Sequence, residues 1–139
     1  TDTLVQNRLG RSVAQIFSFY GEPAFRDHEH SILREMSPEP VVLATGGGIV
    51  LRDDNWEEMR RLGPVVYLRA TADELVRRLD VSRRKRPLLE TDDWQGRVRE
   101  LVAAREERYL RADHVLDVDE GEIDDVAARL ETIFRSAAS

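Results

Sequence analysis

Apolar residues gather in short runs at three places along this 139-residue chain. Residues 40–45 and 64–68 are continuous apolar runs that each contain a pair of valines, whereas residues 114–118 alternate between apolar and polar side chains. Continuous β-branched runs are typical of strands buried on both faces of a parallel sheet, and alternation is typical of a strand with one exposed face. We therefore predict two buried strands, at 40–45 and 64–68, and a third strand nearer an edge at 114–118.

Between these runs the apolar positions recur with the spacing of helices. Ser12 can cap a helix that is closed by Gly21, and Pro23 can open the next helix because proline is tolerated in a first turn. Thr71 can cap a later helix, with Glu74 as its capping-box partner. The predicted helices are 12–19, 23–36, 53–62, 71–79, 94–109 and 122–134.

Strands that alternate with helices predict a three-layer α/β sandwich, in which helices flank a parallel sheet, and we expect residues 1–139 to form a single domain. The stretch from about residue 80 to residue 93 breaks this pattern because it is highly charged, lacks an apolar period and contains Pro87. Loops of this length inside compact domains are usually lids or binding segments, so we expect a lid here.

Composition excludes several classes of function. No apolar run approaches the ~20 residues of a membrane helix. The net charge of −6 leaves no excess of cations for a nucleic-acid backbone. The absence of cysteine excludes thiol chemistry, and the opening residues do not form a secretory signal. His28 and His30 point in different directions on a helix, so with His114 they do not indicate a metal site. We expect a cytoplasmic protein that binds neither membranes nor nucleic acid.

A run of three glycines, Gly46-Gly47-Gly48, follows the first predicted strand. Ligands of open α/β sheets bind beyond the carboxyl ends of the strands. Glycines at such a place let the backbone approach a ligand closely and offer N–H donors. A tight turn alone would need one glycine, so the run favours a ligand site without naming the ligand.

Two arginines are placed to bind an anion. Arg26 and Glu29 share one face of a predicted helix, where an exposed pair would contribute only about 0.3–0.5 kcal/mol. If the glutamate is partly buried, it would instead orient the guanidinium for a carboxylate ligand. Arg105 and Tyr109 form a similar unit. The basic run at residues 83–86 is a solvated surface unless a polyphosphate faces it.

Five short motifs follow one another along the chain: Gly21-Glu22, Phe25-Arg26 with Glu29, Leu43-Ala44-Thr45-Gly46-Gly47-Gly48, Arg86-Pro87-Leu88-Leu89, and Arg105 with Tyr109. In their order and spacing they resemble those of shikimate kinases, and Thr1-Asp2 is similar to the end of that family's Asp-x-Asp motif. The resemblance covers essentially the whole chain and implies a P-loop kinase fold and the ATP-dependent phosphorylation of the 3-hydroxyl of shikimate, a step of chorismate and aromatic amino acid biosynthesis.

The resemblance also implies roles for single residues. Arg26 and Arg105 would bind the shikimate carboxylate, and Asp2 and the backbone of Gly46, Gly47 and Gly48 would bind the ring hydroxyls, with Asp2 also catalytic. The substrate-binding helices would lie within about residues 3–36. Val13, Phe17 and Phe25 match the apolar wall of the shikimate pocket, although an ordinary hydrophobic core explains them equally well.

On the ATP side, the resemblance places Arg86 in the lid that closes over ATP, where its charge would act on the transferring phosphate. Arg78 is similar to the arginine that stacks near adenine. Closure of such a lid would exclude water, and the basic run would then face the phosphates.

One part of the family pattern is not found in these residues. Shikimate kinases carry a central first strand and a phosphate-binding loop that ends Gly-Lys-Ser/Thr, and neither occurs here. We therefore expect Mg²⁺ ligands mainly upstream of Thr1, no metal site within the chain, and no activity from these residues by themselves. Glu107-Arg108 also replaces the family's usual Pro-Leu.

Three readings of the function remain open at this point. The first is a monomeric kinase that binds shikimate and ATP. The second is a truncated, non-catalytic homologue that acts as a binding or regulatory protein. The third is a related kinase of gluconate or of a nucleoside monophosphate, against which Phe25-Arg26 and the glycine run both argue.

Overall fold

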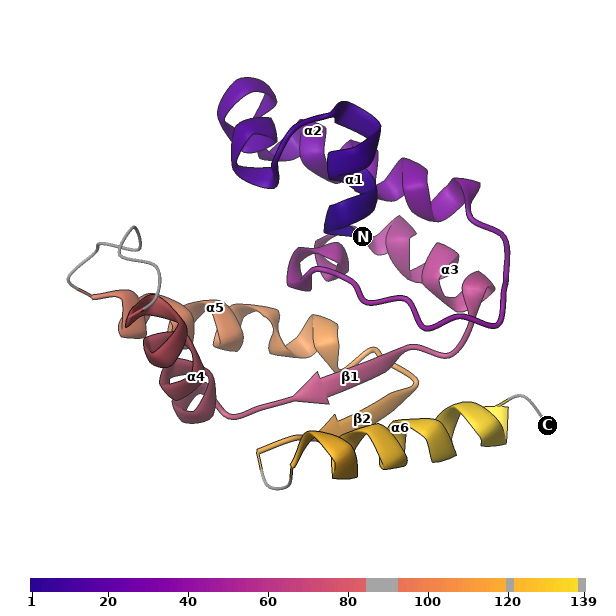
Figure 1. The fold of residues 1–139 in the computed structure, drawn as a ribbon, viewed down its shortest axis with the longest axis vertical. Helices are drawn as coiled ribbons and strands as arrows, with labels where there is room; N and C mark the ends of the chain where they lie inside the picture. Colours follow the sequence, from indigo (N-terminus) through magenta and orange to yellow (C-terminus); the bar gives the residue numbers. More distant parts are fainter. Residues whose placement is uncertain (85–92, 120–121, 138–139) are drawn as a thin grey trace. The chain divides into compact units, whose positions relative to one another are not determined.

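The computed structural model describes residues 1–84, 93–119 and 122–137, with the backbone alone for residues 81–84. They form two compact units, Thr1–Gly63 and Pro64–Ser139 (Figure 1). Within the described ranges, no helix is long and apolar enough to cross a membrane. The elements in chain order are α1 (Asp2–Leu9), α2 (Val13–Glu35), the 3₁₀ turn η1 (Gly47–Leu51), α3 (Asp53–Leu62), β1 (Val66–Arg69), α4 (Ala72–Arg84), α5 (Trp94–Tyr109), β2 (His114–Asp117) and α6 (Ile123–Ala137).

Helix α2 begins with the cap that the sequence predicts. The Ser12 hydroxyl accepts a hydrogen bond from the Gln15 backbone N–H, and the Gln15 side chain accepts one from the Ser12 backbone N–H. Gly21 interrupts the helix with a φ of 83°, a left-handed conformation that glycine adopts without strain. Pro23 follows in the first turn of the second segment. The predicted division of this region into two helical segments is therefore confirmed.

The core of the first unit lies between α1 and α2. Val5, Ile16, Phe25 and Ile32 are its buried members, and Val13 and Phe17 pack against them. The rings of Phe17 and Phe25 have their centroids 4.9 Å apart. Val13, Phe17 and Phe25 therefore pack with the hydrophobic core, and their expected role as the wall of a shikimate pocket stays a prediction.

Helix α3 packs along α2 and completes its carboxyl end. Arg61 donates hydrogen bonds to the backbone carbonyls of Leu33 and Met36, at 2.9 and 3.0 Å. Leu33 lies in the last turn of α2 and Met36 is its C-cap residue, so neither carbonyl has an intrahelical partner. These hydrogen bonds thus supply donors for the free carbonyls at the end of α2, and they orient α3 beside it.

The predicted buried strand at residues 40–45 is wrong. Residues 41–46 have no regular secondary structure, and the side chains of Val41 and Val42 are 61% and 75% exposed. A strand requires a neighbour that shares its backbone hydrogen bonds. Within the described ranges the only paired strands are β1 and β2, so this apolar run has no ladder to join.

The second unit contains the parallel sheet that the sequence predicts. Strands β1 and β2 pair in parallel, with Val66 opposite His114 and Arg69 opposite Asp117. Leu68 of β1 is nevertheless exposed, so the expected burial of this strand on both faces is wrong. With a single neighbour, β1 is an edge strand here, and the apolar run at 64–68 is only half buried.

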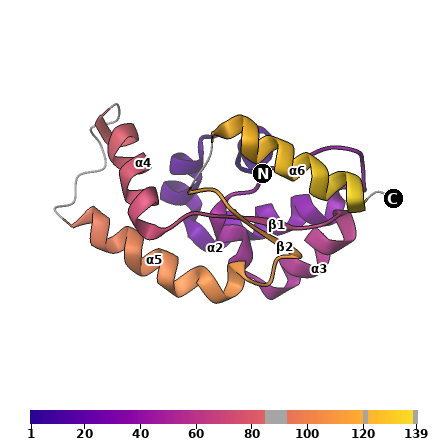
Figure 2. The same ribbon diagram turned by 90° about the horizontal axis from the view of Figure 1, so that it is seen from below.

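Helices cover both faces of this sheet (Figure 2). On one face the ring of Tyr67 stacks on Tyr109 of α5, with centroids 4.9 Å apart. On the other face Val126 and Leu130 of α6 pack against a buried cluster that includes Leu116 of β2. Because successive side chains of a strand alternate between faces, this arrangement gives the three layers expected from the sequence.

Helix α4 begins with half of the predicted capping box. The Glu74 backbone N–H donates to the Thr71 hydroxyl at 3.2 Å, but the Thr71 backbone N–H donates to Asp119 instead of to Glu74. The helix runs to Arg84, beyond its predicted end at residue 79, so residues 80–84 of the expected lid are helical. Residues 85–92, which include Arg86, lie outside the described residues.

Candidate functional site

Two of the predicted substrate residues, Asp2 and Arg26, lie against the glycine run of the first unit. A methyl group added at Gly46 would lie 3.0 Å from Asp2 Oδ1, and one added at Gly48 would overlap the guanidinium of Arg26. The backbone therefore passes close to both charged groups, and a side chain at Gly48 would require the Arg26 guanidinium to move. Asp2 comes from the first turn of α1, Arg26 from α2, and Gly47 and Gly48 from η1.

Two carboxylates hold the guanidinium of Arg26. Nη1 donates to Glu29 Oε1 at 3.1 Å, while Nε and Nη2 donate to Glu22 Oε1 at 3.4 and 3.2 Å. The Glu29 side chain is fully buried, whereas that of Glu22 is 51% exposed. Glu29 is thus the fixed partner that orients Arg26, and Glu22 is the partner that an incoming carboxylate can replace.

Burial raises the pKa of Glu29 above its ordinary value. Arg26 opposes the rise in pKa by its charge and its hydrogen bond, and the nearby charge of Asp2 adds to it. Within the described residues Glu29 Oε2 has no hydrogen-bond partner. The sequence indicated Glu29 as a possible partner of Arg26 by its spacing, but its complete burial could not be read from spacing.

One glycine of the run does not offer the free N–H donor that the sequence suggested. The backbone N–H of Gly46 donates to the hydroxyl of Thr1 at 3.2 Å. This bond, together with the close approach of Asp2 to Gly46, ties the start of α1 to the start of the glycine run. The interaction was not visible in the sequence because its partners are 45 residues apart.

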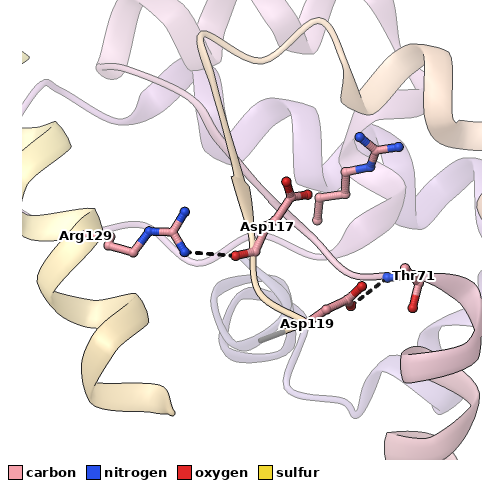
Figure 3. Close-up of a pocket in the computed structure, with 5 residues that line it drawn as sticks. Thr71, Asp117, Asp119 and Arg129 are labelled. Atoms are coloured by element: carbon pink, nitrogen blue, oxygen red, sulfur yellow. Dashed lines mark hydrogen bonds between the residues drawn. The ribbon is translucent and has the colours of Figure 1, made fainter. Parts of the chain in front are cut away.

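The second unit has an open cleft at the carboxyl ends of β1 and β2 (Figure 3). Its volume is about 540 Å³. The backbone N–H of Thr71 donates to Asp119 at 2.8 Å, and Arg129 donates to the carbonyl of Asp117 at 3.1 Å. This cleft was not predicted from the sequence, although ligand sites usually lie beyond the carboxyl ends of parallel strands. The lining residues are Arg69, Thr71, Asp117, Asp119 and Arg129.

Arg78 is fixed at the same end of the sheet. Its Nη2 donates to the carbonyl of Val118 at 2.9 Å, and its Nε donates to Glu74 Oε1 at 2.7 Å. Val118 directly precedes Asp119, which lines the cleft. The predicted nucleotide residue and the cleft therefore share one strand end.

Arg105 lies on α5, and the residues around it anchor that helix to β1. Glu106 accepts a hydrogen bond from the Tyr67 hydroxyl at 2.9 Å and forms an ion pair with Arg69 at 3.2 Å. Burial and the contact with Glu106 raise the pKa of Tyr67 to about 12, so Tyr67 remains a neutral donor at physiological pH. Tyr109, predicted as a partner of Arg105, stacks on Tyr67.

Over residues 1–84, 93–119 and 122–137, no group of three or more His, Asp or Glu side chains could hold a metal ion. Mg²⁺ usually binds through one or two carboxylates plus substrate phosphates. A site of that kind needs no cluster of three side chains, so the expected absence of a metal site within the chain stays a prediction.

Comparison with known proteins agrees with the geometry. The shikimate kinase family model matches residues 1–134. A shikimate kinase from Caldanaerobacter subterraneus is 38% identical over 91% of this chain and 74% of its own length. Shikimate kinase 2 from Sodalis glossinidius is 41% identical over the whole chain and 82% of its own length.

Two solved structures share the fold. The shikimate kinase from Acinetobacter baumannii in complex with shikimate has a TM-score of 0.83 at 28% identity, covering 97% of this chain and 76% of that one. The enzyme from Bacteroides thetaiotaomicron has a TM-score of 0.84 at 31% identity, covering 96% and 81%. These likenesses confirm the α/β fold of P-loop kinase type that the sequence predicted. The chain belongs to the shikimate kinase family.

Proposed function

We propose that the protein transfers the γ-phosphoryl group of ATP to the 3-hydroxyl of shikimate. The observation that carries the proposal is the meeting of Asp2, the glycine run and the Arg26–Glu29 pair in the first unit. Shikimate has one carboxylate and three ring hydroxyls, so its site needs a fixed cation and a hydrogen-bond acceptor. The family to which the chain belongs supplies the reaction, and these residues supply both groups.

Arg26 binds the substrate carboxylate in this proposal, with Arg105 as a second cation. The guanidinium of Arg26 keeps its bond to Glu29 and exchanges the exposed Glu22 for the ligand. A charge-assisted pair of this kind has fixed geometry, and it therefore orients the ring as well as binding it. The backbone of Gly46, Gly47 and Gly48 is proposed to contact the ring hydroxyls beside this cation.

Asp2 accepts the proton of the 3-hydroxyl in the proposed reaction. The hydroxyl oxygen then forms a bond to the γ-phosphorus, and the bond from that phosphorus to the β,γ-bridging oxygen breaks as ADP leaves. Such transfers depend mainly on positioning and on neutralising the charge that spreads over the moving group. Arg86, which lies outside the described residues, is the cation that we propose for that charge.

The nucleotide base belongs at the carboxyl end of β2 in this proposal. Arg78 is held there by the carbonyl of Val118, next to the cleft residue Asp119. The guanidinium plane can stack on a base. Mg²⁺ is proposed as the companion of ATP, as is usual for phosphoryl transfer.

We also propose that residues 1–139 belong to one domain and that the protein acts as a monomer in the cytoplasm. The family match over residues 1–134 supports the single domain. The dependence on ATP and the lack of cysteine fit an intracellular enzyme.

The test uses the full-length protein that contains this sequence, incubated with ATP, Mg²⁺ and one acceptor at a time. Shikimate, gluconate and a nucleoside monophosphate are compared, and the product is identified by ³¹P and ¹H NMR. The proposal predicts phosphate on the 3-hydroxyl of shikimate and no transfer to the other acceptors. Transfer to gluconate or the nucleotide alone would refute it, and binding of shikimate without transfer would favour the non-catalytic alternative.

A further inference from the structure

His30 and Asn55 connect the substrate helix to the turn that contains the glycine run. His30 follows Glu29 on α2, and its Nδ1 lies 2.7 Å from Asn55 Oδ1. Asn55 Nδ2 donates to the backbone carbonyl of Ile49 at 2.8 Å. Ile49 is the residue after Gly48, so an unbroken hydrogen-bonded path joins α2 to the glycine turn. Asn55 is fully buried and the His30 side chain is 13% exposed.

The chemistry of the path determines where its hydrogens lie. A carbonyl can only accept, so the Asn55 amide must present its NH₂ group to Ile49 and its oxygen to His30. His30 Nδ1 must therefore carry a hydrogen whether the ring is neutral or charged. The other ring nitrogen, Nε2, lies 3.4 Å from Asp54 Oδ2, and Asp54 is also held by Arg52. The path therefore depends on the N–H at Nδ1 of His30, which donates to Asn55 Oδ1.

This path joins the helix that carries Arg26 to the residue after Gly48, so it bears on the distance between these two groups. The two groups are so close that a methyl at Gly48 would overlap the guanidinium, so a small shift of η1 relative to α2 would disturb their fit. Asn55 and Trp56 both lie on α3 and both donate to this turn, Trp56 at the carbonyl of Val50. His30 continues the Asn55 contact to α2, the helix that carries Arg26 and Glu29. Arg52, which follows η1, also reaches α2, where it donates to Asp27 at 2.8 Å.

We propose that His30 and Asn55 are positioning residues for the acceptor substrate, which hold the glycine turn at the distance from Arg26 that shikimate binding requires. The inference rests on the proposed function and adds to it two residues that do not touch the substrate. It follows that loss of the Nδ1 donor should weaken the use of shikimate without affecting ATP.

Two substitutions of His30 separate the donor from the bulk of the ring. In His30→Asn the amide N–H stands near the position of Nδ1, whereas in His30→Gln it stands near that of Nε2. We expect His30→Gln to raise the KM for shikimate about three- to tenfold, because a buried acceptor loses its donor. His30→Asn should stay within about twofold of the wild type, and the KM for ATP should not change in either variant. His28→Gln, two residues earlier on α2, is the matched control and should leave both constants unchanged.

The assay is run on the full-length protein, and the wild type is measured first. A wild type that does not phosphorylate shikimate refutes the proposed function. An active wild type whose His30→Gln variant keeps a normal KM for shikimate overturns the positioning role alone. An equal rise in the KM for shikimate in His30→Asn and His30→Gln also overturns the positioning role, because the packing of the side chain and not its Nδ1 donor would then set the KM.

A spectroscopic measurement does not depend on how the variants fold. In the full-length wild type, ¹⁵N NMR of the imidazole distinguishes the protonation of its two nitrogens. We expect His30 to carry a proton on Nδ1 across the pH range in which the protein is folded. A neutral ring protonated only on Nε2 would show that the hydrogen-bonded path does not exist.

Discussion

Gly48→Ala tests how closely the glycine run approaches the cation of the site. Among the described residues, φ lies in the left-handed range only at Gly10 and Gly21, so alanine at position 48 does not strain the backbone. Its methyl group would occupy the space of the Arg26 guanidinium, which must then move away from Glu29. The substitution therefore displaces the cation without removing it.

The size of the effect follows from the contact that is lost. A hydrogen bond to a charged group is worth about 1.5–3 kcal/mol, which corresponds to roughly a 10- to 150-fold rise in the KM for shikimate. The KM for ATP should stay near its wild-type value. The cost in stability should be smaller than that of an unpaired buried charge, since Glu29, whose pKa is already raised, can take up a proton.

The assay is initial-rate kinetics on the full-length protein, with each substrate varied in turn while the other is saturating. Gly63→Ala is the matched control, because a methyl group there meets no heavy atom within 4 Å. A folded Gly48→Ala protein with an unchanged KM for shikimate would refute the reasoning. So would an equal rise in both KM values, since the damage would then not be confined to the acceptor site.

Three further predictions concern single contacts. Arg26→Lys should raise the KM for shikimate at least about tenfold and leave the KM for ATP unchanged, because an ammonium cannot replace the planar fork; similar kinetics for lysine and arginine would contradict this. Because the pKa of Glu29 is raised in the folded protein, its protonation stabilises the fold below pH 4.5, the ordinary pKa of the group, and this stabilisation is lost as pH rises through the folded pKa. The free energy of unfolding measured with urea should not show this loss in Glu29→Gln. A variant whose pH profile of unfolding free energy matches that of the wild type would contradict the prediction. Tyr67→Phe should cost about 1 kcal/mol at pH 8 through the lost bond to Glu106. Because the folded pKa of Tyr67 is raised to about 12, its stabilisation is present below pH 10 and is lost toward pH 12, and a phenylalanine variant as stable as the wild type at pH 8 would disprove the contact.

Local signals in the sequence predicted most of the helices. Ser12 and Gly21 delimit a helical segment because capping and positive φ are properties of a few neighbouring residues. Residues 94–109 form the predicted helix with the predicted ends. The end of α4 was predicted too early because the helix continues through charged residues without an apolar period.

The errors arise where a property depends on distant neighbours. Val41 and Val42 have strong strand character, but whether they form a buried strand depends on a partner strand that local pattern does not describe. The full burial of Glu29, the Thr1–Gly46 contact and the His30–Asn55 pair likewise depend on how helices pack. For the site, the sequence predicted which residues carry the charge, and the structure shows which carboxylates orient Arg26.

The central claim is that Arg26 recognises the carboxylate of shikimate, and a paired ligand-and-residue comparison tests it most directly. Isothermal titration calorimetry of the full-length protein would compare shikimate with its uncharged carboxamide, in the wild type and in Arg26→Gln. The account predicts that the wild type prefers the carboxylate strongly and that this preference falls at least about tenfold in the variant, as expected for the loss of a charge-assisted contact. The same preference in both proteins would show that Arg26 does not bind the carboxylate.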